Sequence, residues 1–98
     1  MRNSLQDEPR LKLDISGAFA RRVTLDGANL AFANLSGADL ANASFRGANF
    51  YRAKMDGTNL RGADLRDAKN LTAEQIDRAI IDNDTRLPDN LAHLEPNH

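Results

Sequence analysis

Few side chains in this chain of 98 residues are of a type that does chemistry, and they are scattered. The chain has no cysteine, which excludes a disulfide framework and a thiolate metal site. His93 and His98 lie near the C-terminus without fixed partners, which a metal ligand or a general base needs. Three serines at outward positions lack a histidine that could activate them: Ser16, Ser36 and Ser44. We therefore predict no catalytic residue, metal or cofactor, no enzyme activity and no small-molecule substrate.

Short acidic and amide side chains recur at intervals of five or ten residues, each next to an alanine or threonine. They are Asn29, Asn34, Asp39, Asn49, Asn59 and Asp64. Such even spacing spreads them around the molecule and does not gather two carboxyl groups for acid–base catalysis. Asn and Asp also hydrogen-bond the nearby backbone in turns. We expect them to build bends.

A five-residue period must position these side chains. From Ala28 to Ala68 a small residue stands at every fifth position, and a larger apolar residue follows two positions after each of the first eight: Leu30, Leu35, Leu40, Phe45, Phe50, Met55, Leu60 and Leu65. Residues two apart share one face of a strand. The next inward residue comes three positions later, so the chain must turn between units. A helix fails because five residues rotate its apolar stripe by roughly 140°.

The number of sides per coil follows less directly from the pattern. Glycines recur every ten residues, at positions 17, 27, 37, 47 and 57. In a four-sided coil they would stack in two columns at bends, where a permissive backbone is useful, whereas in a three-sided coil they would scatter. The spacing favours four sides and leaves three open.

The units G-A-N-L-A, N-L-S-G-A-D-L, R-G-A-N-F and R-G-A-D-L resemble the bacterial pentapeptide-repeat family, whose motif is Ala-(Asp/Asn)-Leu-x-x. The resemblance extends from Leu25 to Ala68. It implies an all-β solenoid, a right-handed quadrilateral β-helix. Thr58 departs from the motif by replacing an alanine, and Ser44, Lys54 and Lys69 replace the usual Asp or Asn.

Four segments are expected. Residues 1–12 form an N-terminal arm or cap, and residues 13–70 form about three coils, roughly 14 Å tall. The array ends at Asn70, which is polar where leucine belongs, and Phe19 turns inward to fill the space beside Ala20. Residues 71–90 form a C-terminal helical cap that starts at a capping box of Thr72 and Gln75. Residues 91–98 form a flexible tail.

Two groups of outward side chains are candidate interaction surfaces. Arg46, Arg61 and Arg66 form a modest basic face, with solvated surface charge as the alternative reading. Phe32 and Tyr51, with Arg52 beside them, are outward aromatics of the kind found at contacts. The alternative is that one terminus of the chain covers them.

Charge and hydropathy narrow the choice of function. No apolar run is long enough to span a membrane or to act as a signal peptide, so we expect a cytoplasmic protein. We predict a non-catalytic protein-interaction or scaffold module with an unknown protein partner. An uncovered edge of the first coil would invite a second copy, so a homodimer is a further expectation.

The resemblance also implies an alternative, because some family members mimic DNA and bind type II topoisomerases such as DNA gyrase. Residues 13–70 carry eight basic and six acidic residues, a net charge of +2, whereas a DNA mimic is anionic. A column of this height would match only roughly four base pairs. Both points disfavour mimicry, and three clustered arginines are weak support for nucleic-acid binding.

Overall fold

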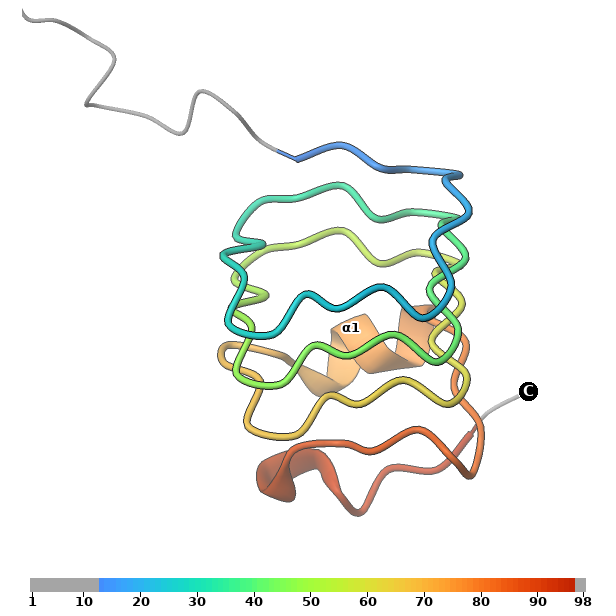
Figure 1. Ribbon diagram of the computed structural model, residues 1–98. Helices are drawn as coiled ribbons and strands as arrows, with labels where there is room; N and C mark the ends of the chain where they lie inside the picture. Colours follow the sequence, from blue (N-terminus) through green and yellow to red (C-terminus); the bar gives the residue numbers. More distant parts are fainter. Residues whose placement is uncertain (1–12, 97–98) are drawn as a thin grey trace, which may run out of the picture.

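The computed structural model describes residues 13–96, and within them the chain winds as a stack of coils (Figure 1). Parallel backbone bridges join residues 20 positions apart, so four pentapeptides complete one coil. These bridges are Asp14–Asn34, Phe19–Asp39, Thr24–Ser44, Asn29–Asn49, Asn34–Lys54, Asp39–Asn59, Ser44–Asp64 and Asn49–Lys69. Each bridge is isolated, because the chain bends before a longer strand can form. The four-sided reading of the glycine spacing therefore holds for these residues.

We number the four sides of the column by their bridges. Side 1 carries Asp14, Asn34 and Lys54; side 2 carries Phe19, Asp39 and Asn59; side 3 carries Thr24, Ser44 and Asp64; side 4 carries Asn29, Asn49 and Lys69. On side 1, the N–H of Asn34 donates to Leu13 O at 2.8 Å, and Ile15 N–H donates to Asn34 O at 3.0 Å. The same two hydrogen bonds recur at the other bridges.

The two inward rows form the core of the column. Leu35, Leu40, Phe45, Phe50 and Leu60 have no exposed surface. The alanine row is also closed from Ala33 to Ala63, because a strand places residues two apart on one face, whereas Ala28 and Ala68 at its ends are half-buried. Thr58 stands in this row fully buried, and its hydroxyl donates a 2.7 Å hydrogen bond to Leu35 O. This bond offsets the cost of burying a hydroxyl group, so threonine is tolerated where the motif has alanine.

The corners adopt the left-handed backbone conformation, and the predicted glycines occupy alternate ones. Gly47, for example, has φ +71°, where a side chain is disfavoured. The intervening corners adopt similar angles with other residues: Arg22, Phe32, Asn42, Arg52 and Asp67. Gly62 is an additional glycine corner. A Cβ atom there would overlap the Asn42 side chain of the coil above.

The helix α1 (Ala73–Arg78) lies below side 1, where the next coil would place a strand (Figure 1). The predicted capping box is present: Gln75 N–H donates to Thr72 Oγ1 at 3.1 Å, and Thr72 N–H donates to Gln75 Oε1 at 2.8 Å. Gln75 Nε2 also donates to Phe50 O and Ala53 O, both at 2.9 Å. The side chain thus supplies a donor that a strand backbone would otherwise provide.

Backbone pairing continues beyond Asn70, where the repeat motif ends in the sequence. Asn59 pairs with Ile80 on side 2, and Asp64 pairs with Arg86 on side 3, at separations of 21 and 22 residues. The pairing uses only backbone groups and therefore survives the loss of the Ala-x-Leu motif. A short 3-10 helix, η2 (Asp89–Leu91), follows.

Phe19 does not turn inward as predicted, because its side chain is 90% exposed. Phe19 is the bridging residue of side 2 in the first coil, and neighbouring strand residues point to opposite faces. Ala20 therefore points inward, and Phe19 must point outward. The predicted arm at residues 1–12 lies outside the described residues. In the predicted tail, Leu91 is buried and Leu94 packs against the core.

Candidate interaction surface

The short acidic and amide side chains build bends, as the sequence predicts. In seven of them, Oδ1 accepts a hydrogen bond of 3.0–3.3 Å from the backbone N–H two residues later: Asp14, Asn29, Asn34, Asp39, Asn49, Asn59 and Asp64. This Asx-turn geometry holds the chain just before each corner. These polar groups therefore serve the scaffold.

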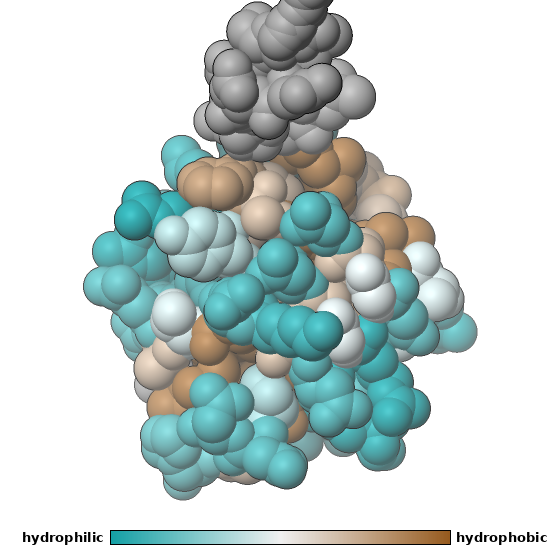
Figure 2. All heavy atoms as spheres, turned by 90° about the vertical axis from the view of Figure 1, so that its left-hand side faces the viewer, coloured by the Kyte–Doolittle hydropathy of each residue, from teal (hydrophilic) through white to brown (hydrophobic). Residues whose placement is uncertain are grey.

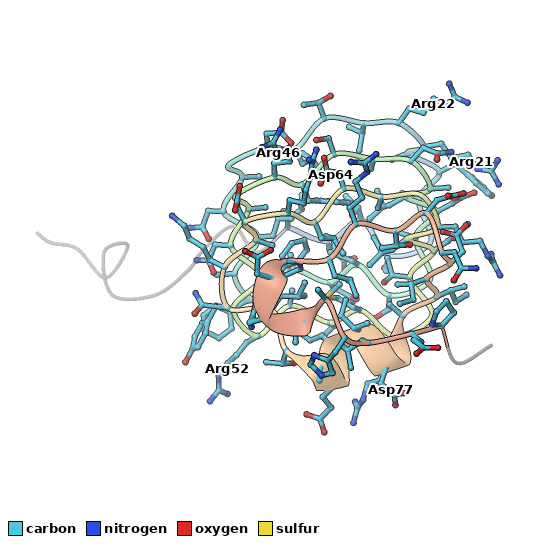
Figure 3. The ribbon with its side chains drawn as sticks, turned by 90° about the horizontal axis from the view of Figure 1, so that it is seen from below. Arg21, Arg22, Arg46, Arg52, Asp64 and Asp77 are labelled. Carbon is cyan, nitrogen blue, oxygen red and sulfur yellow. The ribbon has the colours of Figure 1, made fainter. Side chains whose placement is uncertain are left out.

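Phe32, Tyr51 and Arg52 come together in space, and we call this group the aromatic corner. The rings of Phe32 and Tyr51 meet edge to face, with centroids 5.4 Å apart and planes at 88°. The guanidinium carbon of Arg52 lies 5.6 Å from the centre of the Tyr51 ring, within range of a cation–π contact. Phe32 is 36% exposed and Tyr51 is 44% exposed. In Figure 3, Arg52 projects from the corner opposite Arg22.

Figure 2 views the side of the molecule on which Arg52 lies in Figure 3. Hydrophobic residues gather at the top of the described column and again lower down, and hydrophilic residues separate and flank them. Phe32 and Arg52 themselves occupy left-handed corners, with φ of 62° and 56°, so the aromatic corner is part of the regular series of bends.

A cleft of about 350 Å³ begins at the aromatic corner and runs between residues 51–56 and α1. Lys54, Asp56, Glu74 and Arg78 line it together with Tyr51 and Arg52. Arg78 lies 3.9 Å from both Asp56 and Glu74, and these contacts are loose and exposed. The cleft thus joins an aromatic ring to charges of both signs.

The cleft arises where α1 replaces a strand. Gln75 reaches Ala53 O, but the N–H of Met55 has no hydrogen-bond partner among residues 13–96, although Met55 is only 1% exposed. On sides 2 and 3, the corresponding N–H groups of Leu60 and Leu65 donate to Ile80 O and Arg86 O. Side 1 therefore keeps an unused backbone donor next to the cleft.

Comparison with models of known protein families identifies the family of this chain. The family model described as "Pentapeptide repeats" matches with eight copies, over residues 13–40 and 28–67, which is more than half of the chain. The chain belongs to the pentapeptide-repeat family. Membership implies a right-handed β-helix. No curated protein sequence gives a match.

One solved structure similar to this pentapeptide-repeat protein is that of the pentapeptide repeat protein Rfr23 from the cyanobacterium Cyanothece 51142. The two share 26% sequence identity with a TM-score of 0.68, and the match covers 78% of this chain. This chain matches about half of the solved protein, 51% of its length.

The predicted basic face of this pentapeptide-repeat protein is divided between two sides. Arg46 and Arg66 follow the bridging residues of side 3, whereas Arg61 follows that of side 2. Arg66 binds Asp64 through two hydrogen bonds of 2.9 and 2.7 Å, and Arg46 lies 3.9 Å from Asp67. In Figure 3, Arg46 and Asp64 lie on the same side of the column. Neighbouring acids therefore reduce the positive charge of this face.

These contacts also shift the acidity of the carboxyl groups. The hydrogen bonds from Arg66 hold the pKa of Asp64 below its ordinary value, and the same pair raises the pKa of Arg66. On side 2, Arg21 Nε donates to Asp39 Oδ2 at 2.7 Å and lowers the pKa of Asp39. Both carboxylates are therefore charged and bound at neutral pH.

Sequence reasoning missed the residues that complete the cleft, above all Lys54, Asp56 and Arg78. A spacing of 20 residues carried beyond Asn70 would have placed residue 74 under Lys54. His93 lies elsewhere, in a groove of about 530 Å³ between α1 and residues 93–95. Within residues 13–96, no group of three His, Cys, Asp or Glu side chains is arranged to hold a metal ion. No helix of these residues is long and apolar enough to span a membrane.

Proposed function

We propose that this pentapeptide-repeat protein is a non-catalytic interaction or scaffold module, which binds a protein partner at the aromatic corner and the adjoining cleft. The observation that carries the proposal is the exposed contact of Phe32, Tyr51 and Arg52 at left-handed corners of the column. Tyrosine and arginine are enriched among the residues that dominate binding energy at protein interfaces. A held ring also loses little conformational freedom on binding.

The polar side chains of the column bond to one another and to the backbone, whereas those at the cleft are less engaged, and this contrast supports a binding role for the cleft. The Asx side chains bond the backbone, and Asp39 and Asp64 bind arginines, so their hydrogen-bonding capacity serves the column. The cleft differs, because it is lined by Lys54, which forms no ion pair within 4 Å among residues 13–96, and by Met55, whose N–H has no hydrogen-bond partner among the same residues. We infer that the partner presents an acidic or carbonyl-rich segment to the cleft and an apolar group to Tyr51.

At the lower end of the column, we propose that α1, Ile80 and Arg86 close the fourth level. The burial of Ile76 and the backbone pairs on sides 2 and 3 support this role. A closed lower end suits a short module, because terminal repeats must shield the core of the array from water.

The test compares Tyr51→Ser with Arg61→Ser, a matched control on another side of the column. The immobilised chain is incubated with lysate from its native cells, and the retained proteins are quantified by mass spectrometry. We expect one partner that the wild type and Arg61→Ser retain equally. Its Kd for the Tyr51→Ser chain should rise roughly 30-fold, about 2 kcal/mol, while the melting temperature stays unchanged.

Two outcomes would contradict the proposal. One is a partner that Tyr51→Ser retains as well as the wild type does, which would place the contact elsewhere. The other is catalytic turnover of a metabolite that a single surface substitution abolishes. Mimicry of DNA is the less favoured alternative, because the net charge of residues 13–70 is positive.

A further inference from the structure

Among residues 13–96, the upper edge of the first coil carries backbone groups without hydrogen-bond partners on all four sides. Its bridging residues are Asp14, Phe19, Thr24 and Asn29. In the second coil, the corresponding residue uses its N–H and its C=O toward the coil above, as Asn34 does with Leu13 and Ile15. In the first coil, these four N–H and four C=O groups have no hydrogen-bond partner among residues 13–96. Each side therefore presents one donor and one acceptor on its bridging residue, and a further carbonyl two positions later, on Ser16, Arg21, Asp26 or Ala31.

The same edge leaves the core of the column partly open. Val23 and Leu25 are half-buried, whereas Ala43 and Phe45, 20 residues later, are buried. Leu13 is 39% exposed. Together with the exposed Phe19 ring, this end combines exposed apolar surface with strand edges that are unpaired among residues 13–96, and such a combination favours association.

We propose that a second copy of this chain docks on the edge head to head, related by a two-fold axis perpendicular to the column. When two residues face each other in an antiparallel pair, each donates its N–H to the other's C=O. The first-coil edge offers both groups on one residue per side, so it is complementary to its own copy. If the axis passes through the centre of side 1, side 1 of one copy faces side 1 of the other, and side 3 faces side 3. Side 2 of each copy then faces side 4 of the other. All four sides then run antiparallel.

A second first-coil edge fits this surface better than other occupants do. An extended peptide could pair with one side and would leave the others open. The lower end of another copy does not match, because α1 lies below side 1, and Ile80 and Arg86 already pair with sides 2 and 3. Head-to-tail stacking is thus disfavoured, whereas head-to-head docking closes after two copies.

The charges of the first coil permit this contact. Residues 13–32 carry two acidic side chains, Asp14 and Asp26, and two basic ones, Arg21 and Arg22. The two copies therefore carry no net charge at the contact. One like-charge pair, Asp14 and its copy, lies opposite itself on side 1, where each carboxylate is bound by the N–H and the hydroxyl of its own Ser16. This inference is independent of the proposed function. Although Phe32 belongs to the first coil, its N–H points away from the upper edge and donates to Tyr51 O, and the cleft lies toward the other end of the column.

The first test measures the mass of the full chain by light scattering over a concentration series, with Thr24→Pro as the variant. Proline removes an N–H that has no partner within the described part of one copy, and it is tolerated on a strand edge whose N–H faces solvent. We expect a dimer for the wild type and for the control Arg61→Ser. For Thr24→Pro, the dimer Kd should rise at least about tenfold, because two symmetry-related hydrogen bonds are lost.

Amide hydrogen exchange of the full wild-type chain is the second test and does not depend on the variant folding. We expect the N–H groups of Thr24 and Asn29 to become protected as the concentration rises through the dimer Kd, while that of Ser44 stays protected throughout. Protection of Thr24 in a monomer at every concentration would show that another part of the same chain covers the edge. Rapid exchange up to the highest soluble concentration would show an open edge. Either result overturns the proposal.

Discussion

At the scale of single residues, the corners are the most constrained positions of this protein. Every fifth residue from Gly17 to Asp67 has positive φ, yet only part of these corners are glycine. A left-handed conformation costs a residue with a side chain about 1–2 kcal/mol. Phe32 and Arg52 accept this cost at the aromatic corner, so two candidate binding residues occupy backbone positions where glycine would be easier.

Alanine substitutions at two glycine corners should separate backbone strain from crowding. Gly47→Ala meets open space at φ +71° and should lower the free energy of unfolding by about 1 kcal/mol. Gly62→Ala should cost up to about 1 kcal/mol more, because Asn42 must move. Urea unfolding measures both values. In an Asn42→Gly background, the excess cost of Gly62→Ala should vanish, and its persistence would refute the crowding argument.

The pair of Asp64 and Arg66 predicts a pH dependence. The folded-state pKa of Asp64 lies below its unfolded value of about 4. The pair's stabilisation is therefore fully present above that pH and is lost as pH falls through the folded-state pKa. Arg66→Gln should raise the pKa of Asp64 in an NMR titration and reduce the loss of stability between neutral pH and pH ~3. The pKa of Asp39, which Arg21 holds, should stay unchanged and serves as the control.

At the scale of elements, α1 shows how a helix can complete a β-column. Its six residues take the place of one side, and the side chain of Gln75 hydrogen-bonds the strand backbone above. The helix also turns Ile76 into the core, where it is 4% exposed. One amide side chain thus contributes to the stability of the lower end, beside the buried Ile76 and the backbone pairs on sides 2 and 3.

Replacing this amide should weaken the whole lower end. Gln75→Ala removes both bonds to carbonyl groups and the capping-box acceptor, and it should lower the free energy of unfolding by about 2–3 kcal/mol. Glu74→Ala is the matched control on the same helix. Among the described residues, its side chain makes one exposed 3.9 Å contact, with Arg78, so the change should stay within about 0.5 kcal/mol. Equal effects in denaturant unfolding would contradict this role of Gln75.

The sequence predicts the parts of this fold that follow from periodicity. The inward rows, the bends, the glycine columns and the capping box at Thr72 all follow from residue type and spacing. The continuation at Ile80 and Arg86 could not be predicted in this way, because backbone pairing leaves no mark in side-chain types. To predict the contact of Phe32 with Tyr51, one must know that a coil has 20 residues. To predict the cleft, one must also know where α1 lies.

At the scale of the whole molecule, the distribution of net charge along the chain distinguishes a protein-binding module from a mimic of DNA. Residues 13–70 carry a net charge of +2, and residues 71–98, with six acidic and two basic residues, carry −4. The negative charge therefore lies toward one end and does not run along the column as it does along DNA.

A supercoiling assay with DNA gyrase tests the alternative function directly. We expect no inhibition by this chain at low micromolar concentration, because the column is short and its repeat region is slightly basic. A known inhibitor of gyrase in the same assay is the positive control. Clear inhibition that survives the Tyr51→Ser change would favour DNA mimicry over the proposed module.

Because bridged residues are 20 positions apart, each pentapeptide advances the chain by one quarter of a turn about the column axis. Duplicating one pentapeptide between Arg52 and α1 would rotate everything after it by a quarter turn about the axis. The aromatic corner and α1 would then lie on different sides of the column from those they occupy now. Adding four pentapeptides at the same place would restore the original orientation of the two features and lengthen the column by one coil. Length and facing direction are thus separate quantities that a change in repeat number can set independently.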